Sequence, residues 1–248
     1  MTAGSQAEID GLKKIGHIVG LTLNVMIKSV KPGMTTKELD LIGQSFLQSK
    51  GARSAPILVY HFPGTTCISI NEEAAHGIPG SRIIHPGDLV NIDVSAELDG
   101  LFADTGASIP IPPISAEDQR LCACTLEALK KALEVARAGN PLNAIGKAVE
   151  GEARRCGFNI INALNGHGVG HSLHEDPHFI PNYFNPNDKR LLKEGMVIAI
   201  EPFLTPGNGQ VVNASDGWTI RTADGRRLAQ YEHSVIITQG KPIILTAV

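Results

Sequence analysis

The 248-residue sequence predicts an α+β protein in which helices flank an antiparallel sheet. Its predicted helices come in pairs that are followed by runs of strands, an order typical of antiparallel sheets rather than of alternating βαβ units. No Pro/Ser-rich or low-complexity linker divides the chain, so we expect one domain over residues 1–248. Segments 31–51 and 137–157 also share a length and a basic-x-Gly, helix, Gly pattern, which predicts two pseudo-symmetric halves of about 1–110 and 111–248.

Helices are expected where an apolar period of about 3.6 residues follows a start signal. Two of them begin at capping boxes, in which Ser5 precedes Glu8 and Thr35 precedes Glu38, and Ser115 begins a weaker version of the same motif. These signals predict helices near residues 5–29, 35–50, 115–138 and 141–156.

Strands are expected in segments that are rich in β-branched residues and bounded by turn residues. They are residues 67–70, 89–96, 101–108, 157–161, 196–201, 218–221 and 228–238. The stretch Glu97-Leu98-Asp99-Gly100 separates the second and third of these strands and predicts a four-residue hairpin turn.

Two aspartates occupy the strands of this predicted hairpin. A turn centred between Leu98 and Asp99 places Asp93 directly opposite Asp104 on one face, with Cβ atoms roughly 5 Å apart. Like charges repel at that separation, and burying an unpaired charge costs several kcal/mol. Because the neighbouring Val and Ile side chains offer no cation, we expect a bound metal ion to supply the positive charge.

Two further carboxylates repeat this pattern. Glu201 ends the apolar segment MVIAIEP, and Glu232 opens the segment YEHSVIIT. A single carboxylate at a strand end is usually exposed or paired with Arg, but four of them on apolar strands favour a metal site. Oxygen-rich ligation suits hard or borderline divalent ions, and two ions bridged by carboxylates are the usual hydrolytic arrangement.

Histidines cluster beside these carboxylates in the sequence. The segment NGHGVGHSLHEDPH contains His167, His171, His174 and His178 next to a run of glycines that allows close approach of the backbone. His76 lies in a separate loop, NEEAAHGIPG. The alternative interpretation of the larger cluster is a solvated polar loop.

The same segment contains a misleading motif. Residues 174–178 match the zinc-protease pattern HExxH, which binds zinc only when both histidines lie one turn apart on a helix. Pro177 disfavours an interior helical turn, and the glycine-rich stretch before it has no helical period. We therefore reject the zinc-protease interpretation.

Charge and cysteine usage narrow the functional class. The chain has 22 Lys+Arg against 25 Asp+Glu, a net charge of −3, without runs of one sign, which disfavours binding to nucleic acid or to a membrane surface. The first residues lack the apolar core of a signal peptide, and no apolar run approaches the ~18 residues of a membrane span. Four cysteines form no CxxC pair and are expected as reduced thiols, so we expect a cytoplasmic protein.

With these residues assembled, the chain resembles the type I methionine aminopeptidases over nearly its whole length. Five blocks carry the resemblance, in sequence order: CISINEEAAHGIP, VNIDVSAELDGLFADT, GHGVGHSLHEDP, IAIEPF and GWTIRTADGRRLAQYEHSV. The resemblance implies the pita-bread fold, an antiparallel sheet flanked by helices with two pseudo-symmetric halves around a dinuclear site. It also implies removal of the initiator methionine from peptides and nascent proteins, with a water or hydroxide between the two metal ions as the nucleophile.

The resemblance assigns roles to particular residues. It implies two divalent ions, such as Co, Mn or Fe, with the ligands Asp93, Asp104, His167, Glu201 and Glu232. Glu201 is expected as the general base, His174 as the contact to the scissile carbonyl, and His76 as the contact to the substrate or the leaving amine. The remaining substrate contacts are expected in a small pocket for the methionine side chain: Tyr60, Phe62, Cys67 and Trp218, together with His76 and His174.

Three positions depart from the family pattern and leave the shape of the pocket open: Leu173, His171 and Pro56. We expect a preference for a small second residue, action on nascent chains with a transient ribosome contact through the catalytic domain, and a monomer. One alternative is a proline-directed aminopeptidase of the same fold, which usually needs an extra N-terminal domain for which this chain has no room. The other is an inactive member that binds a partner, although such proteins typically lose the metal ligands that this sequence keeps.

Overall fold

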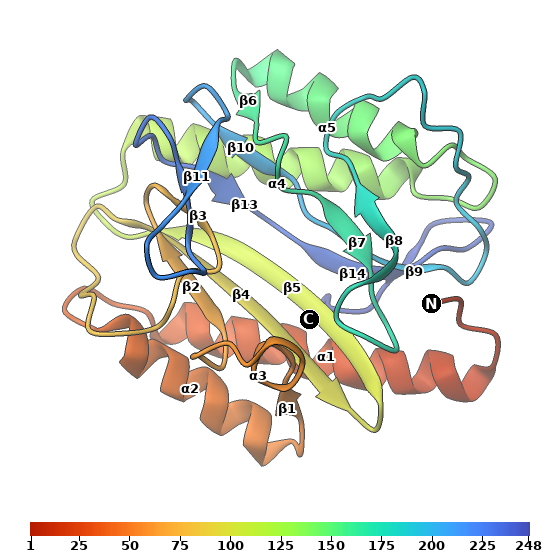
Figure 1. Ribbon diagram of the computed structural model, residues 1–248, viewed down its shortest axis with the longest axis horizontal. Coiled ribbons are helices and arrows are strands. Elements are labelled where there is room, and N and C mark those ends of the chain that lie inside the picture. The colour runs from red at the N-terminus through yellow and green to blue at the C-terminus, as the bar shows by residue number, and fades with distance from the viewer.

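The computed structural model describes residues 1–248 and confirms the α+β class. Strands run through the middle of the molecule, with α1 (Gln6–Ser29) and α2 (Thr36–Ser49) on one side in Figure 1 and α4 (Ala116–Val135) and α5 (Asn143–Cys156) on the other. All paired strands are antiparallel. None of the helices is both long and apolar enough to cross a bilayer.

The four predicted helices are confirmed, three of them with their start signals, whereas α5 begins without a side-chain cap. Ser5 and Glu8 form a complete capping box at α1, as do Thr35 and Glu38 at α2. At α4 the Ser115 side chain accepts a hydrogen bond from the backbone of the residue three positions on. These bonds satisfy backbone N–H groups that have no partner inside a helix, which is why the helices begin there.

A fifth helix, α3 (Ala55–Tyr60), was not predicted. It has six residues, too few for an apolar period to be visible, but it begins with Ser54 as N-cap and with Pro56 in its first turn. His61 ends it in the left-handed region at φ 57°. This short helix ends at Tyr60, whose position becomes important below.

The strands are β1 (Arg53–Ser54), β2 (Cys67–Ile70), β3 (Glu73–Ala75), β4 (Leu89–Leu98), β5 (Leu101–Pro110), β6 (Asn159–Ile160), β7 (Gly166–Gly168), β8 (Glu175–Ile180), β9 (Val197–Ile200), β10 (Phe203–Thr205), β11 (Val211–Asn213), β12 (Ile220–Thr222), β13 (Ala229–Gln230), β14 (His233–Ile236) and β15 (Ile243–Ile244). One sheet contains β1, β4 and β2 in that order, with β5 also paired to β4. A second has the order β15-β14-β9-β7-β8, and two smaller sheets have the orders β13-β10-β6 and β11-β12-β3.

The strand predictions are correct for β2, β4, β5 and β9, but three need correction. The segment 228–238 is two strands interrupted at Tyr231 and Glu232, the segment 157–161 is a strand only at 159–160, and the segment 218–221 becomes a strand at Ile220. Strands β1, β3, β7, β8, β10, β11 and β15 were not predicted. All but β8 have only two or three residues, so each is defined by its pairing with a distant strand rather than by its own pattern.

The predicted register of the β4–β5 hairpin is wrong by two residues. Leu98 pairs with Leu101, which leaves Asp99 and Gly100 as a two-residue turn with φ of 54° and 84°. Asp-Gly is the preferred pair for such a turn, because both residues tolerate the left-handed backbone. Asp104 therefore pairs with Ser95, and Asp93 pairs with Gly106.

Two large apolar clusters hold the layers together. One lies between α1, α2 and the β2–β4–β5 sheet and includes Ile15, Met26 and Ile92. The other packs α4 and α5 against strands of the second half and includes Leu129, Val149 and Ile198. The division into halves at about residue 110 stays a prediction.

Candidate active site

A cavity of about 450 Å³ gathers the residues that the sequence singled out. Ten of them line it: Tyr60, Phe62, Cys67, His76, Asp93, Asp104, His167, His174, Glu201 and Trp218. The eleventh, Glu232, is only 2% exposed and lies close to Asp104 and His167. Residues from most of the chain length therefore meet at one place.

Strand pairing explains how the acidic residues converge. His167 on β7 pairs with Ala199 on β9, and His233 on β14 pairs with Ile200, so the ends of these strands bring His167, Glu201 and Glu232 together. The β4–β5 hairpin is attached to this group by backbone contacts: the Glu232 N–H donates to the carbonyl of Gly106 at 2.9 Å.

Two hydroxyl groups reinforce the same junction. Thr105 Oγ1 donates to the carbonyl of Glu232 at 2.7 Å, and Ser234 Oγ donates to the carbonyl of Asp104 at 2.8 Å. Ser234 Oγ also accepts a hydrogen bond from the Asp104 N–H at 2.9 Å. The backbone of Asp104 is thus fixed against the strand that follows Glu232.

The donor atoms at the base of the cavity are close enough to share an ion. His167 Nε2 lies 3.4 Å from Glu201 Oε1 and 3.9 Å from Asp104 Oδ2. Ligand atoms of Asp104, His167 and Glu232 all lie within 4.8 Å of one another. Asp93 shares a face of the hairpin with Asp104, since the two-residue correction in register leaves the facing side unchanged.

The electrostatics of this group favour binding of a cation. Burial, and then the neighbouring carboxylates, hold the pKa of Asp104 and of Glu201 well above the usual range, and burial with the charge of Glu201 does the same for the pKa of Glu232. Burial also raises the pKa of Asp93. Two carboxylate oxygens, Asp104 Oδ1 and Glu232 Oε1, are buried without any hydrogen-bond partner. These oxygens fit a divalent metal ion, which would supply both the charge and the missing partner.

His167 has the tautomer that a ligand needs. Burial lowers the pKa of His167 to about 4, so its imidazole is neutral. Its Nδ1 lies 3.0 Å from the carbonyl of Gly168, and a carbonyl only accepts, so Nδ1 carries the proton. The lone pair is then on Nε2, the atom that faces Glu201 and Asp104.

A second histidine stacks on this one. The rings of His174 and His167 have centroids 4.0 Å apart, and the Tyr60 hydroxyl lies 2.8 Å from His174 Nδ1. Burial, and then the neighbouring His167 and His76, lower the pKa of His174 to about 3. The ring still has surface open to the cavity, so it can reach a bound molecule as a neutral group.

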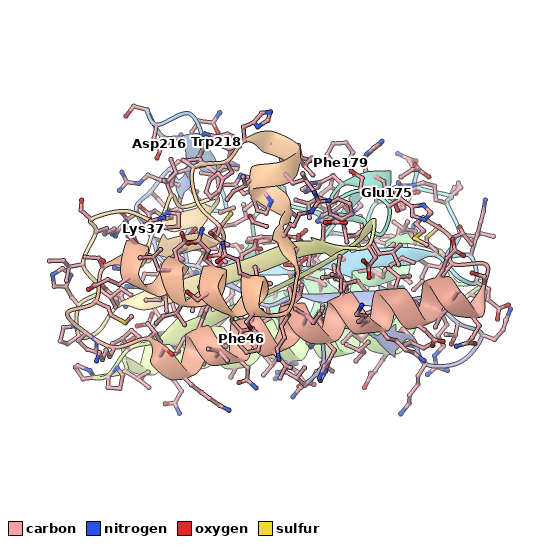
Figure 2. All side chains as sticks on the ribbon, turned by 90° about the horizontal axis from the view of Figure 1, so that it is seen from below. Lys37, Phe46, Glu175, Phe179, Asp216 and Trp218 are labelled. Atoms are coloured by element: carbon pink, nitrogen blue, oxygen red, sulfur yellow. The ribbon has the colours of Figure 1, made fainter.

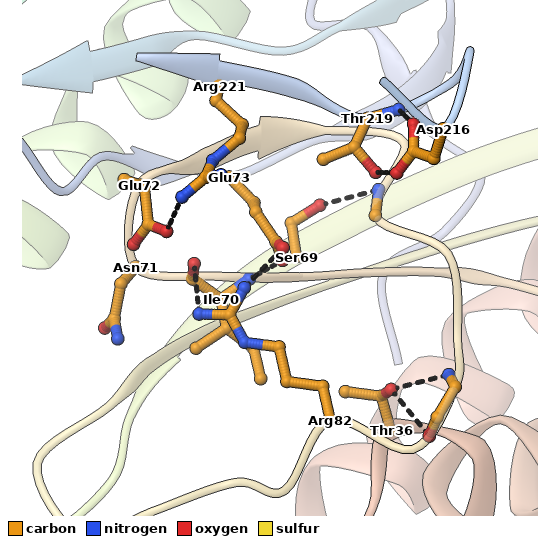
Figure 3. Close-up of polar contacts among 12 residues, drawn as sticks. Thr36, Ser69, Ile70, Asn71, Glu72, Glu73, Arg82, Asp216, Thr219 and Arg221 are labelled. Atoms are coloured by element: carbon orange, nitrogen blue, oxygen red, sulfur yellow. Dashed lines mark hydrogen bonds and ion pairs between the residues drawn. The ribbon is translucent and has the colours of Figure 1, made fainter. Parts of the chain in front are cut away.

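His76 reaches the cavity from a strained and firmly held loop. Its φ of 56° is in the left-handed region, which costs a residue with a side chain of order 1 kcal/mol or more. Figure 3 shows the contacts that hold this loop: the N–H of Gly77 donates to Ser69 Oγ, the N–H of Gly80 donates to Thr36 Oγ1, and Arg221 pairs with Glu72. Thr219 Oγ1 also lies 3.5 Å from the His76 carbonyl.

One wall of the cavity is aromatic and contains sulfur. Phe62 and Trp218 meet edge to face with ring centroids 5.2 Å apart, and Cys67 is a buried thiol whose pKa is raised by burial. The backbone of Trp218 is fixed by Asp216, whose Oδ1 accepts its N–H at 2.9 Å. Trp218 therefore serves as a cavity wall rather than as core packing.

The opposite rim contains residues that sequence reasoning missed. In Figure 2, Trp218 and Phe179 lie on the same side of the molecule with the short helix α3 between them, and Phe179 is 65% exposed. The cavity is also lined by Ser95, Asn165, His178 and Phe179, none of which received a role from the sequence. A correct hairpin register would have identified Ser95, because it faces Asp104.

The departures from the family pattern separate into two groups. Pro56 and Leu173 line the cavity, so they do bear on its shape. His171 does not line it, and its Nε2 lies 3.7 Å from Glu8 Oε1. Residues 175–180 form β8, which confirms that the HExxH match is not on a helix.

A second cluster of metal-ligating residues lies between α4 and α5. It contains Cys124, Glu152 and Cys156. The Glu152 carboxylate already forms ion pairs with Lys131 and Arg155, so its negative charge is neutralised without a metal ion. It does not have the unpartnered buried oxygens that mark the cavity site.

Comparison with known proteins gives the same picture over the full chain. The family model described as metallopeptidase family M24 matches residues 10–239. The chain is 50% identical over 247 residues to methionine aminopeptidase 2 of Bacillus subtilis strain 168, covering 99% of both chains. It is 45% identical over 252 residues to a methionine aminopeptidase of Staphylococcus epidermidis strain RP62A, covering 100% of this chain and 99% of the relative.

Solved structures of other proteins have the same fold as this chain. The methionine aminopeptidase of Thermotoga maritima superposes with a TM-score of 0.96 at 34% identity, with 100% of both chains covered. The prolidase of Pyrococcus furiosus superposes with a TM-score of 0.81 at 24% identity, and the match covers 100% of this chain but 66% of the prolidase. At that identity the second likeness concerns the fold alone.

Proposed function

The chain belongs to metallopeptidase family M24 and has the pita-bread fold, and we propose that it removes the N-terminal methionine from peptides and nascent proteins by metal-dependent hydrolysis. One observation carries this proposal: a group of buried, unpaired carboxylates and a neutral imidazole shares a single cavity with a wall of aromatic rings and a thiol. The relatives that are 50% and 45% identical are named methionine aminopeptidases. The five sequence blocks favour the type I subgroup.

Five residues would hold two divalent metal ions: Asp93, Asp104, His167, Glu201 and Glu232. Carboxylate oxygens with one imidazole suit Mn²⁺, Fe²⁺ or Co²⁺. When bound, such ions would supply Lewis acidity and lower the pKa of water. The unpartnered oxygens of Asp104 and Glu232 support this assignment, because each retains the capacity to bind a cation.

The reaction needs a base and a hydrogen-bond donor, and the cavity contains both. Glu201 would accept the proton of the attacking water at a carboxylate oxygen, since it lines the cavity with its Oε1 only 3.4 Å from His167 Nε2, beside the site where the ions would be held. His174 would donate from Nε2 to the carbonyl oxygen of the first peptide bond, where negative charge develops. His76 would contact the substrate near the leaving amine.

The aromatic wall would select the methionine side chain. A thioether against the edges of Phe62 and Trp218 and beside the Cys67 thiol is a favourable contact. Tyr60 and Phe179 also line the cavity and are exposed at the surface, so they would crowd the second residue of the substrate and favour a small one.

A peptide mixture tests this function directly. Metal-stripped protein, with Mn²⁺ or Co²⁺ restored, is incubated with Met-Ala-Ser, Met-Leu-Ser and Ala-Pro-Ala, and the products are read by mass spectrometry. We expect metal-dependent release of Met from Met-Ala-Ser and little from Met-Leu-Ser. Cleavage of Ala-Pro-Ala would instead indicate the proline-directed activity. If none of the three peptides is cleaved although metal is shown to be bound, an inactive binding protein would be favoured.

The cellular setting is part of the same proposal. Four free cysteines are typical of a reducing compartment, which supports the cytoplasm. We propose a monomer that contacts the ribosome transiently while it acts on nascent chains. Light scattering on the purified protein tests the first statement, and co-sedimentation with ribosomes at low and high salt tests the second.

A further inference from the structure

Tyr60 and His174 form a hydrogen bond between distant parts of the chain. The Tyr60 hydroxyl, at the end of α3, lies 2.8 Å from Nδ1 of His174, which directly precedes β8. The hydroxyl has no other hydrogen-bond partner in the protein. Because the ring of Tyr60 stands tilted at 57° to the imidazole with centroids 5.6 Å apart, the contact is directed through the hydroxyl rather than through stacking.

The direction of this hydrogen bond decides where the imidazole carries its proton. A neutral imidazole has one N–H, and the other nitrogen has a lone pair. When the phenol donates to Nδ1, the proton is on Nε2, which makes no hydrogen bond within the protein, on a ring that lines the cavity. His174 then presents a donor to the cavity.

The neighbouring His167 is held in the opposite state. The carbonyl of Gly168 requires the proton on Nδ1 of His167 and leaves the lone pair on Nε2. The two rings are 4.0 Å apart, and with the phenol as donor His167 would offer a lone pair while His174 would offer an N–H. A separate second partner for each ring is what allows two adjacent histidines to do different chemistry.

We propose that Tyr60 is a positioning residue whose hydroxyl holds His174 with its proton on Nε2, aimed at the carbonyl oxygen of the scissile bond. This inference rests on the proposed function and adds to it, since Tyr60 is otherwise only a wall of the methionine pocket. The two roles make different predictions, because a wall needs the ring whereas a positioning residue needs the hydroxyl.

Tyr60→Phe separates the two roles, since it keeps the ring and removes the hydroxyl. We expect kcat for Met-Ala-Ser to fall about tenfold with KM within twofold of its original value, at the lower end of the roughly 10–100-fold loss that follows removal of the second partner of a metal-binding histidine. Tyr183→Phe removes a hydroxyl from a tyrosine outside the cavity and serves as the matched control, with no change expected.

A double-mutant cycle shows whether the effect passes through His174. In the His174→Ala background, Tyr60→Phe should have no further effect on kcat, because the imidazole that the hydroxyl positions is absent. An equal loss in both backgrounds would overturn the inference, and so would a variant that changes KM alone.

Nitrogen-15 NMR of the imidazoles gives a second readout that needs no metal and no turnover. The His174 signals are those lost in His174→Ala, and we expect them to show protonation at Nε2 in the unmodified protein and a changed pattern in Tyr60→Phe. Protonation of His174 at Nδ1 would refute the inference. If the unmodified protein fails to cleave Met-Ala-Ser, the proposed function fails; if it cleaves normally and Tyr60→Phe does too, only this inference fails.

Discussion

Asp104→Asn should have opposite effects on the metal-free and the metal-loaded protein. Without metal, Asp104 is a 6% exposed acid among three other carboxylates, and one of its oxygens has no hydrogen-bond partner. Asparagine removes the charge and adds an N–H₂ group that can donate to the neighbouring carboxylates. The metal-free variant should therefore be more stable than the metal-free original protein at pH 7.5.

The size of this gain follows from the buried group. A buried polar atom without a partner costs about 1–3 kcal/mol, and a charge in that position costs more, so we expect a gain in the free energy of unfolding of about 1–3 kcal/mol. Burial, and then the neighbouring carboxylates, hold the pKa of Asp104 well above that of an exposed aspartate. The folded protein therefore holds this proton more tightly than the unfolded chain, and the original protein loses stability as the pH rises above about 4. Below that pH the gain from Asp104→Asn should vanish.

With metal bound, the original protein should be more stable than Asp104→Asn. At a free metal concentration about 1,000 times the Kd, binding stabilises the folded state by about 4.1 kcal/mol, which exceeds the gain of about 1–3 kcal/mol, and Asp104→Asn should forfeit most of this stabilisation because it weakens a central ligand. Activity should fall by several orders of magnitude. Urea unfolding at pH 4 and pH 7.5, with EDTA or with Mn²⁺, measures the stability of each protein in each condition. Asp10→Asn, at an exposed position, is the control. A metal-free variant that is less stable than the original at pH 7.5 would refute the reasoning.

Three further predictions concern other parts of the molecule. His174→Ala should lower kcat by about 10²–10³-fold with a smaller change in KM, measured by steady-state kinetics; a pure KM effect would mean that His174 only positions the substrate. Trp218→Ala should raise KM for Met-Ala-Ser more than it lowers kcat, because it removes the ring that packs against Phe62. A variant with the same kcat and KM as the original protein would contradict a contact between Trp218 and the methionine side chain. Glu152→Gln should destabilise the protein by about 1–3 kcal/mol at pH 7, since Arg155, with Lys131, lowers the pKa of this buried carboxylate to about 2. That difference should shrink as the pH falls from 4.5 toward 2 in urea unfolding, and a constant difference would contradict the ion pairs.

Much of the fold could be predicted because its signals are local. The capping boxes at Ser5 and Thr35 place two helices to within a residue, and β-branched runs locate β2, β4, β5 and β9. Strands of two or three residues, such as β1 and β3, depend on pairing with segments far away in the sequence. The hairpin register failed because Asp99 and Gly100 were counted within a longer turn, although their preference for the left-handed backbone defines a turn of two residues.

The sequence predicted which residues lie together around the cavity, but not which of them contact one another. Carboxylates on apolar strands are visible in the sequence because their burial is anomalous, and this identified Asp93, Asp104, Glu201 and Glu232. Ser95 and Phe179 carry no such anomaly, and their places in the cavity depend on the hairpin register and on β8. The hydrogen bond from Tyr60 to His174 joins residues 114 positions apart, so no pattern in the sequence could show it.

The same burial that makes the site costly to fold also makes it chemically effective. Solvent would give each carboxylate its own hydrogen bonds and would let both imidazoles exchange protons between their two nitrogens. In the folded protein, the carbonyl of Gly168 and the hydroxyl of Tyr60 each contact one ring, so the arrangement of donors and acceptors is set before substrate arrives. The unpartnered Asp104 carboxylate and the left-handed backbone of His76 therefore both lower the stability of the folded protein at this site. Variants that relieve either should gain stability while they lose turnover.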